Sequence, residues 1–259
     1  MNSKNKFLVV GNWKANPDTA KDAKQLFAGI KKQAGKMKNI ETVICPSYLH
    51  LPILKPMAGN LALGAQDFFY EANGSFTGSV GYEALLDQKI KYAIIGHSER
   101  RAMGETDEIV GKKLLSAVSN SIRPILCVGE KSRDTDLAYL NIIKTQLVEA
   151  FSKVPKSKVQ NVLVAYEPIW AIGKNATRDA RPPEIKEVVI FIKRVIGDIY
   201  KTKSVPPIKI LYGGSVDAKN AGYLMEDSGI DGFLVGRASL DAKTFGLLLG
   251  NINESSSRK

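Results

Sequence analysis

Residues 162–173 read VLVAYEPIWAIG, an apolar run with a carboxylate at its end. The small and β-branched residues that lead the run are typical of a buried strand. Glu167 follows that strand directly, and Pro168 cannot continue a central strand and biases Glu167 away from helical dihedral angles. Trp170 and Ile172 are too apolar for a loop that only faces water. The stretch therefore predicts a strand that ends in a base beneath a movable loop.

Short apolar runs of this kind recur along the whole chain. Eight of them lie at Phe7–Gly11, Thr42–Cys45, Leu61–Ala65, Tyr92–Gly96, Pro124–Val128, Val162–Tyr166, Ile208–Tyr212 and Gly232–Gly236. Between them lie amphipathic stretches with helical spacing, such as Ala20–Gln33, Thr106–Ser119, Ala138–Phe151, Pro183–Tyr200 and Lys219–Met225. Strands and helices are thus predicted to alternate.

Apolar strands that alternate with helices need a parallel sheet covered on its faces. Eight such units in 259 residues predict an α/β fold, a single closed (β/α)8 barrel with eight parallel strands and outer helices. An open, doubly wound sheet is the alternative. No linker rich in Pro, Ser or Gly divides the chain, so residues 1–250 are expected to form one catalytic barrel domain. The polar, low-complexity end, residues 251–259, is expected to be a disordered tail.

The composition is that of an ordinary globular chain, because 44% hydrophobic residues can supply a large core. No apolar run approaches the roughly 20 residues of a membrane span, and no cleavable signal pattern precedes Phe7. We therefore expect a cytoplasmic protein that does not bind a membrane. Cys45 and Cys127 lie in apolar runs, which favours buried, reduced thiols over a disulfide or a metal site.

The formal net charge of +11 would attract an anionic partner. Many lysines fall on helical stretches such as residues 21–38, so we interpret the excess as a solvated basic surface. Aromatic and basic residues do not interleave as they do in nucleic-acid-binding proteins. No nucleic-acid partner is therefore expected.

The carboxyl ends of barrel strands meet at one rim, where the catalytic groups of such barrels gather. The residues at those ends are Asn12-Trp13-Lys14, His97-Ser98-Glu99-Arg100, Glu167, Gly213-Gly214-Ser215 and Gly236-Arg237. Each has an ordinary explanation on its own: a solvated lysine, a helix-capping histidine, a surface carboxylate or a tight turn. Together they supply a cation, a neutral hydrogen-bond donor, a base and a glycine-rich anion site, which predicts an active site.

Several motifs make the chain resemble the triosephosphate isomerases from Val9 to about Leu240. They are Gly11-Asn12-Trp13-Lys14, Gly74-Ser75-Phe76-Thr77-Gly78, Gly96-His97-Ser98-Glu99-Arg100-Arg101, Cys127-Val128-Gly129-Glu130, Tyr166-Glu167-Pro168-Ile169-Trp170-Ala171-Ile172-Gly173 and Tyr212-Gly213-Gly214-Ser215-Val216. The resemblance implies a TIM barrel that interconverts dihydroxyacetone phosphate and D-glyceraldehyde 3-phosphate in glycolysis and gluconeogenesis. It also implies proton transfer through an enediol or enediolate, without cofactor or metal. This family is itself a reference case for acid and base tuning and for lid closure.

By the same resemblance, four residues are catalytic. Glu167 would move a proton between the two carbons, and Ile172 and Leu234 would close over it and exclude water. His97 would act on the oxygens as a neutral donor, since the positive end of a helix dipole disfavours an imidazolium. Lys14 would supply a fixed positive charge, and its neighbour Asn12 would donate a hydrogen bond to the developing oxyanion.

The resemblance also assigns residues around these four. Glu99 would lie near Lys14, and Ser98 would be a resting partner of Glu167; a helix cap is the alternative for Ser98. Asn12, Lys14, Gly173, Ser215 and Gly236 would bind the substrate, the last three holding its phosphate through backbone amides.

Two departures from the family lie near that phosphate site. The family usually has a second glycine where this chain has Arg237, whose guanidinium would either lie near the phosphate or point into solvent. After Gly173 the family usually continues Thr-Gly-Lys, whereas residues 174–183 read KNATRDARPP. The longer, charged lid is expected to change closing or product release without removing the base.

In this family the loop around Thr77 reaches into a neighbouring subunit, so we expect a homodimer. Phe68, Phe69, Tyr70 and Phe76 would cover the partner rather than form local core. Ser79 and Asp67 stand where the family commonly has Glu and Asn, so some polar contacts across that interface must differ.

Two other classes compete with the isomerase. A phosphate-binding barrel epimerase would need metal ligands, but the chain has only two histidines, and His50 lies outside every motif. A catalytically impaired phosphate-binding barrel could act as a binding module through its net charge, but Asn12, Lys14, His97 and Glu167 are all intact. Loss of activity in chelator would favour the first class, and a salt-sensitive gel shift without isomerase activity the second.

Overall fold

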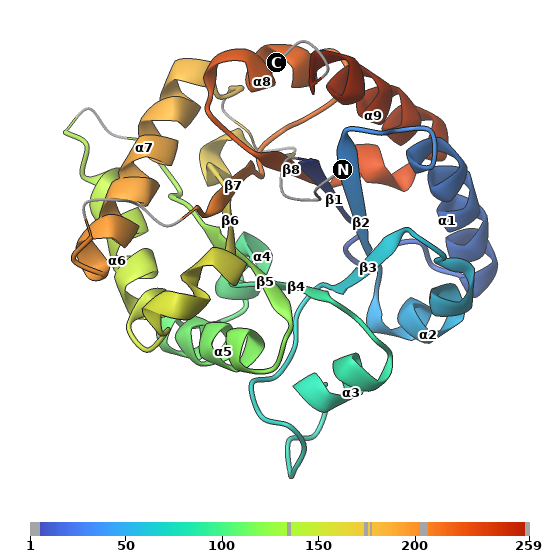
Figure 1. Ribbon diagram of the computed structural model, residues 1–259, viewed down its shortest axis with the longest axis horizontal. Coiled ribbons are helices and arrows are strands. Elements are labelled where there is room, and N and C mark those ends of the chain that lie inside the picture. The colour runs from blue at the N-terminus through green and yellow to red at the C-terminus, as the bar shows by residue number, and fades with distance from the viewer. Residues whose placement is uncertain (1–5, 134–135, 174–175, 177, 203–206, 257–259) are drawn as a thin grey trace.

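Eight parallel strands close into a barrel at the centre of the molecule, and helices surround it (Figure 1). The structure, a computed structural model, describes residues 6–256 except 134–135, 174–175, 177 and 203–206. The strands are β1 (Phe7–Asn12), β2 (Ile40–Cys45), β3 (Ala62–Ala65), β4 (Tyr92–Ile95), β5 (Arg123–Val128), β6 (Leu163–Tyr166), β7 (Lys209–Tyr212) and β8 (Gly232–Val235). Each strand pairs with the next, and β1 pairs with β8 in register Val10 to Leu234. The predicted (β/α)8 barrel is confirmed, and the open sheet is wrong.

The helices lie between the strands as the amphipathic pattern predicts. They are α1 (Ala20–Ala34), α2 (Leu51–Leu54), α3 (Tyr82–Asp87), α4 (Ser98–Ala102), α5 (Asp107–Ser119), α6 (Tyr139–Phe151), α7 (Pro182–Ile199), α8 (Ala221–Asp227) and α9 (Ala242–Ser256). Thr106 is the N-cap of α5, because its hydroxyl accepts the Ile109 N–H at 3.3 Å, so the helix begins one residue later than predicted. None of the helices within the described residues has the length and apolar character that crossing a bilayer requires.

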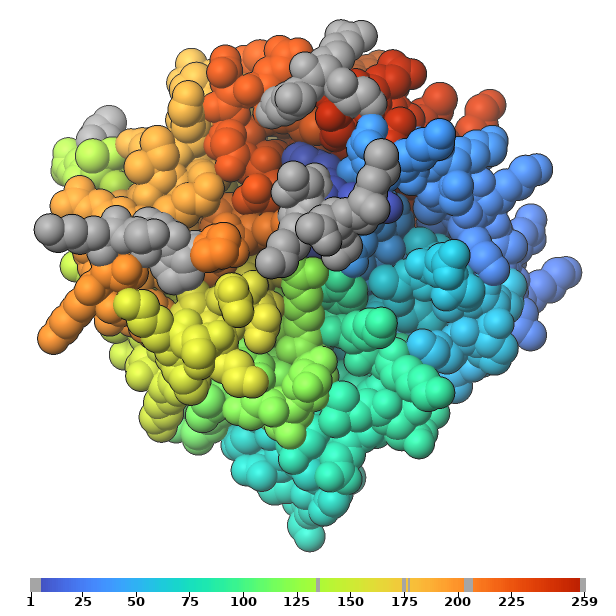
Figure 2. All heavy atoms as spheres, in the orientation of Figure 1, coloured from blue at the N-terminus to red at the C-terminus, as the bar shows by residue number. Residues whose placement is uncertain are grey.

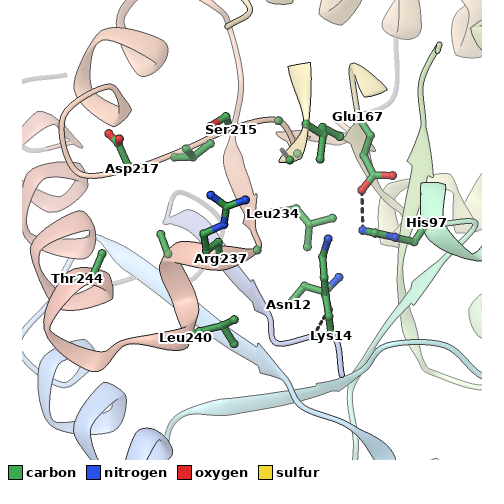
Figure 3. Close-up of a pocket in the computed structure, with 17 residues that line it drawn as sticks. Asn12, Lys14, His97, Glu167, Ser215, Asp217, Leu234, Arg237, Leu240 and Thr244 are labelled. Atoms are coloured by element: carbon green, nitrogen blue, oxygen red, sulfur yellow. Dashed lines mark hydrogen bonds and ion pairs between the residues drawn. The ribbon is translucent and has the colours of Figure 1, made fainter. Parts of the chain in front are cut away.

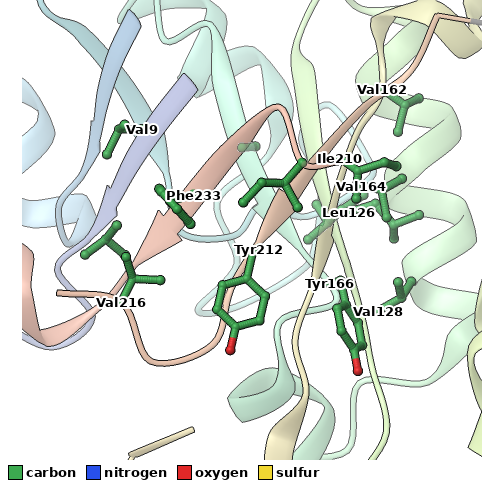
Figure 4. Packing of buried hydrophobic residues seen from close by; sticks show 14 of the residues in the cluster. Val9, Leu126, Val128, Val162, Val164, Tyr166, Ile210, Tyr212, Val216 and Phe233 are labelled. Carbon is green, nitrogen blue, oxygen red and sulfur yellow. The ribbon is translucent and has the colours of Figure 1, made fainter. Parts of the chain in front are cut away.

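Side chains along each strand alternate between two cores. On β6, Leu163 and Ala165 point into the barrel, where they pack with inward residues of the other strands. Val164 and Tyr166 point outward into the larger core between strands and helices (Figure 4). Both faces of each strand are therefore buried, which explains the continuous apolar runs.

The two cysteines lie inside the barrel. Cys45 and Cys127 are both free and buried. Burial raises the pKa of each thiol above its ordinary value, so both stay protonated at neutral pH. The prediction of buried thiols is confirmed.

The expected disordered tail is wrong for residues 251–256, because α9 continues to Ser256. Ile252 is fully buried, and the Asn253 side chain accepts the Asn39 N–H at 3.1 Å. Helix α9 contacts α1 and α8 and so completes the outer layer. The rest of the predicted tail, residues 257–259, lies outside the described residues.

We expect Ile252→Ala to lower the free energy of unfolding by about 2–5 kcal/mol, because it leaves a cavity beneath the last turn of α9. Leu247→Ala on the same helix, where the side chain is 58% exposed, is the matched control and should change it by less than about 0.5 kcal/mol. Urea unfolding at one fixed protein concentration measures both. Equal effects of the two variants would show that the end of α9 does not pack.

Candidate active site

A cavity of about 500 Å³ opens at the carboxyl ends of the strands (Figure 3). The predicted site residues that line it are Asn12, Lys14, His97, Glu167, Gly173, Ser215 and Gly236. Ile172 and Leu234, the predicted hydrophobic cover, also line it. Ser98 and Glu99 contact site residues from outside the lining, and Thr77 is not among the residues around this cavity.

Glu167 leaves the end of β6 in a space that two glycines keep open. Its N–H donates to the Val128 carbonyl at 2.8 Å, which extends the pairing of β5 and β6 by one residue. A Cβ on Gly129 would lie 1.8 Å from the Glu167 carbonyl oxygen, and a Cβ on Gly213 would lie 3.0 Å from Glu167 Cγ. Neighbouring strands therefore determine where this carboxylate lies.

The carboxylate of Glu167 is 3% exposed, and both of its oxygens have partners. His97 Nε2 lies 3.1 Å from Oε1, and the Ser98 N–H donates to Oε2 at 2.9 Å. Ser98 thus contacts Glu167 through its backbone amide. The cap of α4 is His97 instead of Ser98, since His97 Nδ1 accepts the Glu99 N–H at 3.2 Å. An accepting Nδ1 leaves the proton of a neutral imidazole on Nε2, facing Glu167.

A buried ionic network, which sequence reasoning missed, fixes the backbone of Gly96, the residue before His97. The Glu105 side chain accepts the Gly96 N–H at 3.1 Å, and Arg101 Nε donates to the Gly96 carbonyl at 2.7 Å. Glu105 also pairs with Lys113, whose ammonium lies 2.5 Å from Asp67. Lys113 stands on the inner face of α5, and a lysine on the apolar stripe of an amphipathic helix is the signal that could have revealed the network.

Lys14 is positioned by its backbone as much as by its side chain. Its φ is +55°, an uncommon conformation for a non-glycine residue, and Asn12 Oδ1 accepts its N–H at 3.0 Å. Gln66, which follows β3, donates from Nε2 to the Lys14 carbonyl at 2.8 Å and to the Cys45 carbonyl at 2.9 Å. The Lys14 ammonium lies 2.5 Å from Glu99, as the resemblance implies. Gln66 had no predicted role, although its place at a strand end was a signal.

Glu130 supports the entrance of the lid and was also missed. It is fully buried, and its Oε1 accepts hydrogen bonds from Tyr166 Oη and Trp170 Nε1, each at 2.8 Å. Its carbonyl accepts the Ile169 N–H at 3.0 Å, at the start of the 3-10 turn η5 (Ile169–Ala171). Glu130 therefore links the end of β6 to the first residues of the lid.

The lid is described at its entrance, at Ala176 and at its exit. Gly173 has a φ of +76°, and the predicted departures at Lys174, Asn175 and Thr177 lie outside the described residues. At the exit, the Arg178 guanidinium stacks 4.5 Å from the Trp170 ring and pairs with Glu184 on α7 at 2.7 Å. Arg178, a charged residue of the lid exit, therefore contacts Trp170 at the lid entrance.

Burial raises the pKa of Glu130 above its ordinary value of 4.5, although the hydrogen bonds from Trp170 and Tyr166 oppose the rise. The folded protein therefore binds this proton more tightly than the unfolded chain does. Ionisation then lowers the free energy of unfolding as the pH rises from about 4.5 through the raised value.

We expect Glu130→Gln, which keeps an acceptor oxygen, to gain stability relative to the parent chain as the pH rises through that window and to level off above it. Urea unfolding of both proteins across the pH series measures the difference. A difference that is constant with pH, or that moves in favour of the parent chain, would contradict this account of Glu130.

Comparisons with known proteins agree with this geometry. A sequence model of the family "Triosephosphate isomerase" matches residues 7–252. The triosephosphate isomerase of Alkaliphilus oremlandii is 40% identical over 95% of this chain and 98% of its own length. Those of Moorella thermoacetica and Endomicrobium trichonymphae are 38% and 39% identical, over 93% and 92% of this chain and 97% and 95% of their own lengths. The family predicted from the motifs is confirmed: the chain belongs to the triosephosphate isomerases.

Proposed function

We propose that Glu167 and His97 carry out the triose phosphate isomerisation that membership of this family assigns to the chain. Glu167 takes a proton from one carbon of dihydroxyacetone phosphate and returns it to the neighbouring carbon, which yields D-glyceraldehyde 3-phosphate. The observation that carries the proposal is the buried pair of Glu167 Oε1 and His97 Nε2, 3.1 Å apart in one cavity with Lys14. A base and a donor this close can serve adjacent carbon and oxygen atoms of one substrate.

His97 begins in its neutral form: its Nε2–H protonates one substrate oxygen, and the imidazolate so formed takes the proton from the neighbouring oxygen, which restores the neutral ring. The hydrogen bond that Nδ1 accepts from the Glu99 N–H favours this tautomer, with Nε2–H as the donor. A neutral imidazole suits an enediolate, because the proton moves within one hydrogen bond and the total charge of the two groups does not change.

Lys14 and Asn12 stabilise the negative charge that develops on the substrate oxygen. The Asn12 Oδ1 atom already accepts the Lys14 N–H, which leaves the side-chain amide of Asn12 as a donor. Glu99, 2.5 Å from the ammonium, orients Lys14 without lining the cavity. Fixed donors of this kind stabilise a transition state because they need no reorganisation when the charge appears.

The backbone at Gly173, Ser215 and Gly236 binds the phosphate, and the Ser215 hydroxyl assists. All three residues line the cavity, on the lid and on the turns after β7 and β8, and Ser215 lies across it from His97 (Figure 3). Ile172 and Leu234 exclude water from Glu167, which makes proton abstraction from a weak carbon acid less uphill.

It stays a prediction that the reaction needs no metal and no other cofactor. The described residues contain no group of three or more His, Cys, Asp or Glu side chains that could hold a metal ion. Conversion of glyceraldehyde 3-phosphate, followed through NADH oxidation in a coupled assay, should be unchanged by chelator. Activity lost in chelator would favour the metal-dependent epimerase class, and folded protein without conversion would favour the binding module.

The cytoplasmic location also stays a prediction, supported by the buried free thiols.

We expect Glu167→Asp to lower kcat about 100-fold while KM changes by less than about threefold, because the shorter side chain misplaces the base and leaves the phosphate site intact. Glu226→Asp on the exposed face of α8 is the matched control and should behave as the parent chain does. An aspartate variant at position 167 as fast as the parent chain would remove Glu167 as the base.

The homodimer is the second part of the proposal. The segment between β3 and α3 projects from the body of the molecule (Figures 1 and 2). In this segment Phe76 is 42% exposed although its ring lies 4.4 Å from that of Phe69. Leu49, in the 3-10 turn Tyr48–His50 after β2, and Met103, at the end of α4 after β4, are also exposed. These exposed apolar side chains, in the connections that follow β2, β3 and β4, fit a subunit interface that brings Thr77 to the partner's cavity. Asp67 instead pairs within its own chain, with Lys113 and Arg100.

We expect Phe76→Asp to produce monomers, because it places a charge in the apolar centre of the interface. Ile190→Asp, at a position on α7 that is 59% exposed, is the control and should leave the dimer intact. Sedimentation velocity of the three proteins at equal concentration measures the change. A parent chain that sediments as a monomer, or a dimeric Phe76→Asp variant, would reject this interface.

A further inference from the structure

Arg237 places a second cationic side chain in the wall of the cavity. It follows Gly236 after β8, begins the 3-10 turn η7 (Arg237–Leu240), and lines the same cavity as Lys14. The resemblance to the family leads us to expect a glycine at this position. The arginine therefore adds a charge and a long side chain to the part of the cavity where the phosphate is proposed to bind.

Within the described residues, the Arg237 guanidinium has no ion-pair or hydrogen-bond partner. The other charged groups of the wall are engaged: Lys14 lies 2.5 Å from Glu99, and Glu167 is held by His97 and the Ser98 N–H. Asp217 is also used locally, since its Oδ1 accepts the N–H groups of Lys219 at 2.7 Å and Asn220 at 3.0 Å. Arg237 thus carries the available positive charge of this wall.

The turn accommodates arginine without backbone strain. Arg237 is absent from the described non-glycine residues with positive φ. A Cβ on Gly236 would lie 3.6 Å from Lys14 Cε, so the turn still lies against the lysine stem. The Arg237 side chain is exposed and points from η7 toward the loop that carries Ser215, which lines the same cavity (Figure 3).

We propose that Arg237 is an additional substrate-binding residue, whose guanidinium contacts the phosphate group together with the backbone at Ser215 and Gly236. The proposal rests on the function proposed above and extends its phosphate site. A planar guanidinium offers two parallel N–H donors to two phosphate oxygens, which a glycine cannot do. We infer that this contact is the same in the ground state and the transition state, so that it acts on affinity instead of turnover.

The test compares Arg237→Gln, Arg237→Lys and Arg237→Gly with the parent chain, using calorimetric titration of inorganic phosphate and the coupled isomerase assay. We expect Arg237→Gln and Arg237→Gly to weaken phosphate binding about tenfold and to raise KM for glyceraldehyde 3-phosphate by a similar factor. The phosphate affinity of Arg237→Lys should fall between theirs and that of the parent chain, because lysine keeps the charge but loses the two parallel N–H donors. In all three variants kcat should stay within about twofold.

Arg194→Gln is the matched control, since Arg194 is exposed on α7 and does not line the cavity. It removes the same net charge and should leave phosphate binding unchanged. The parent chain should also lose phosphate affinity more steeply with added salt than Arg237→Gln does.

Two results would overturn the proposal while leaving the isomerase function in place. One is a phosphate affinity of Arg237→Gln equal to that of the parent chain. The other is an equal loss in Arg194→Gln, which would make the effect one of long-range charge. Conversely, weaker phosphate binding by Arg237→Gln in a protein that converts no substrate would support Arg237 as an anion contact and reject the isomerase.

Discussion

Closure of the parallel barrel is the constraint on which the rest of this structure depends. Each strand pairs with its neighbours on both sides, so its direction and register are determined by the whole ring. The carboxyl ends of all strands therefore lie at one rim, and residues from β1, β4, β6, β7 and β8 surround one cavity. Glu167 illustrates the dependence: its N–H bonds to the end of β5, and Gly213 after β7 leaves room for its side chain.

Glu167 and Lys14, the acidic and basic side chains at the centre of the site, each pair with a different partner. Glu167 is held by His97 and a backbone amide, and Lys14 is held by Glu99. The partners of Glu167 lower the cost of burying its carboxylate, and the partly exposed pair of Lys14 and Glu99 holds the ammonium in one geometry. The network of Glu105 and Lys113 extends this support to the backbone that precedes His97.

The departures that the resemblance identifies lie in surrounding elements instead of the groups proposed to transfer the proton. Arg237 lines the cavity beside Gly236 and Ser215, and Arg178 joins the exit of the lid to Trp170 and to α7. Asp67 takes an ionic role within its own chain. Each adds or redirects a charge around the proposed base and donor, a change by which a barrel can alter binding or lid motion while keeping its chemistry.

The sequence by itself determined the strands, the main helices and the residues at the strand ends, because a strand buried on both faces must be apolar throughout and glycine-rich turns mark where it stops. It failed at the end of α9, where polar residues predicted disorder but burial of Ile252 against the rest of the barrel stabilises a helix. Only the tertiary structure decided that Ser98 contacts Glu167 through its amide and that Gln66 and Glu130 support the site. Those contacts join residues far apart in the chain, and their geometry follows from the register of a closed barrel, which no local pattern encodes.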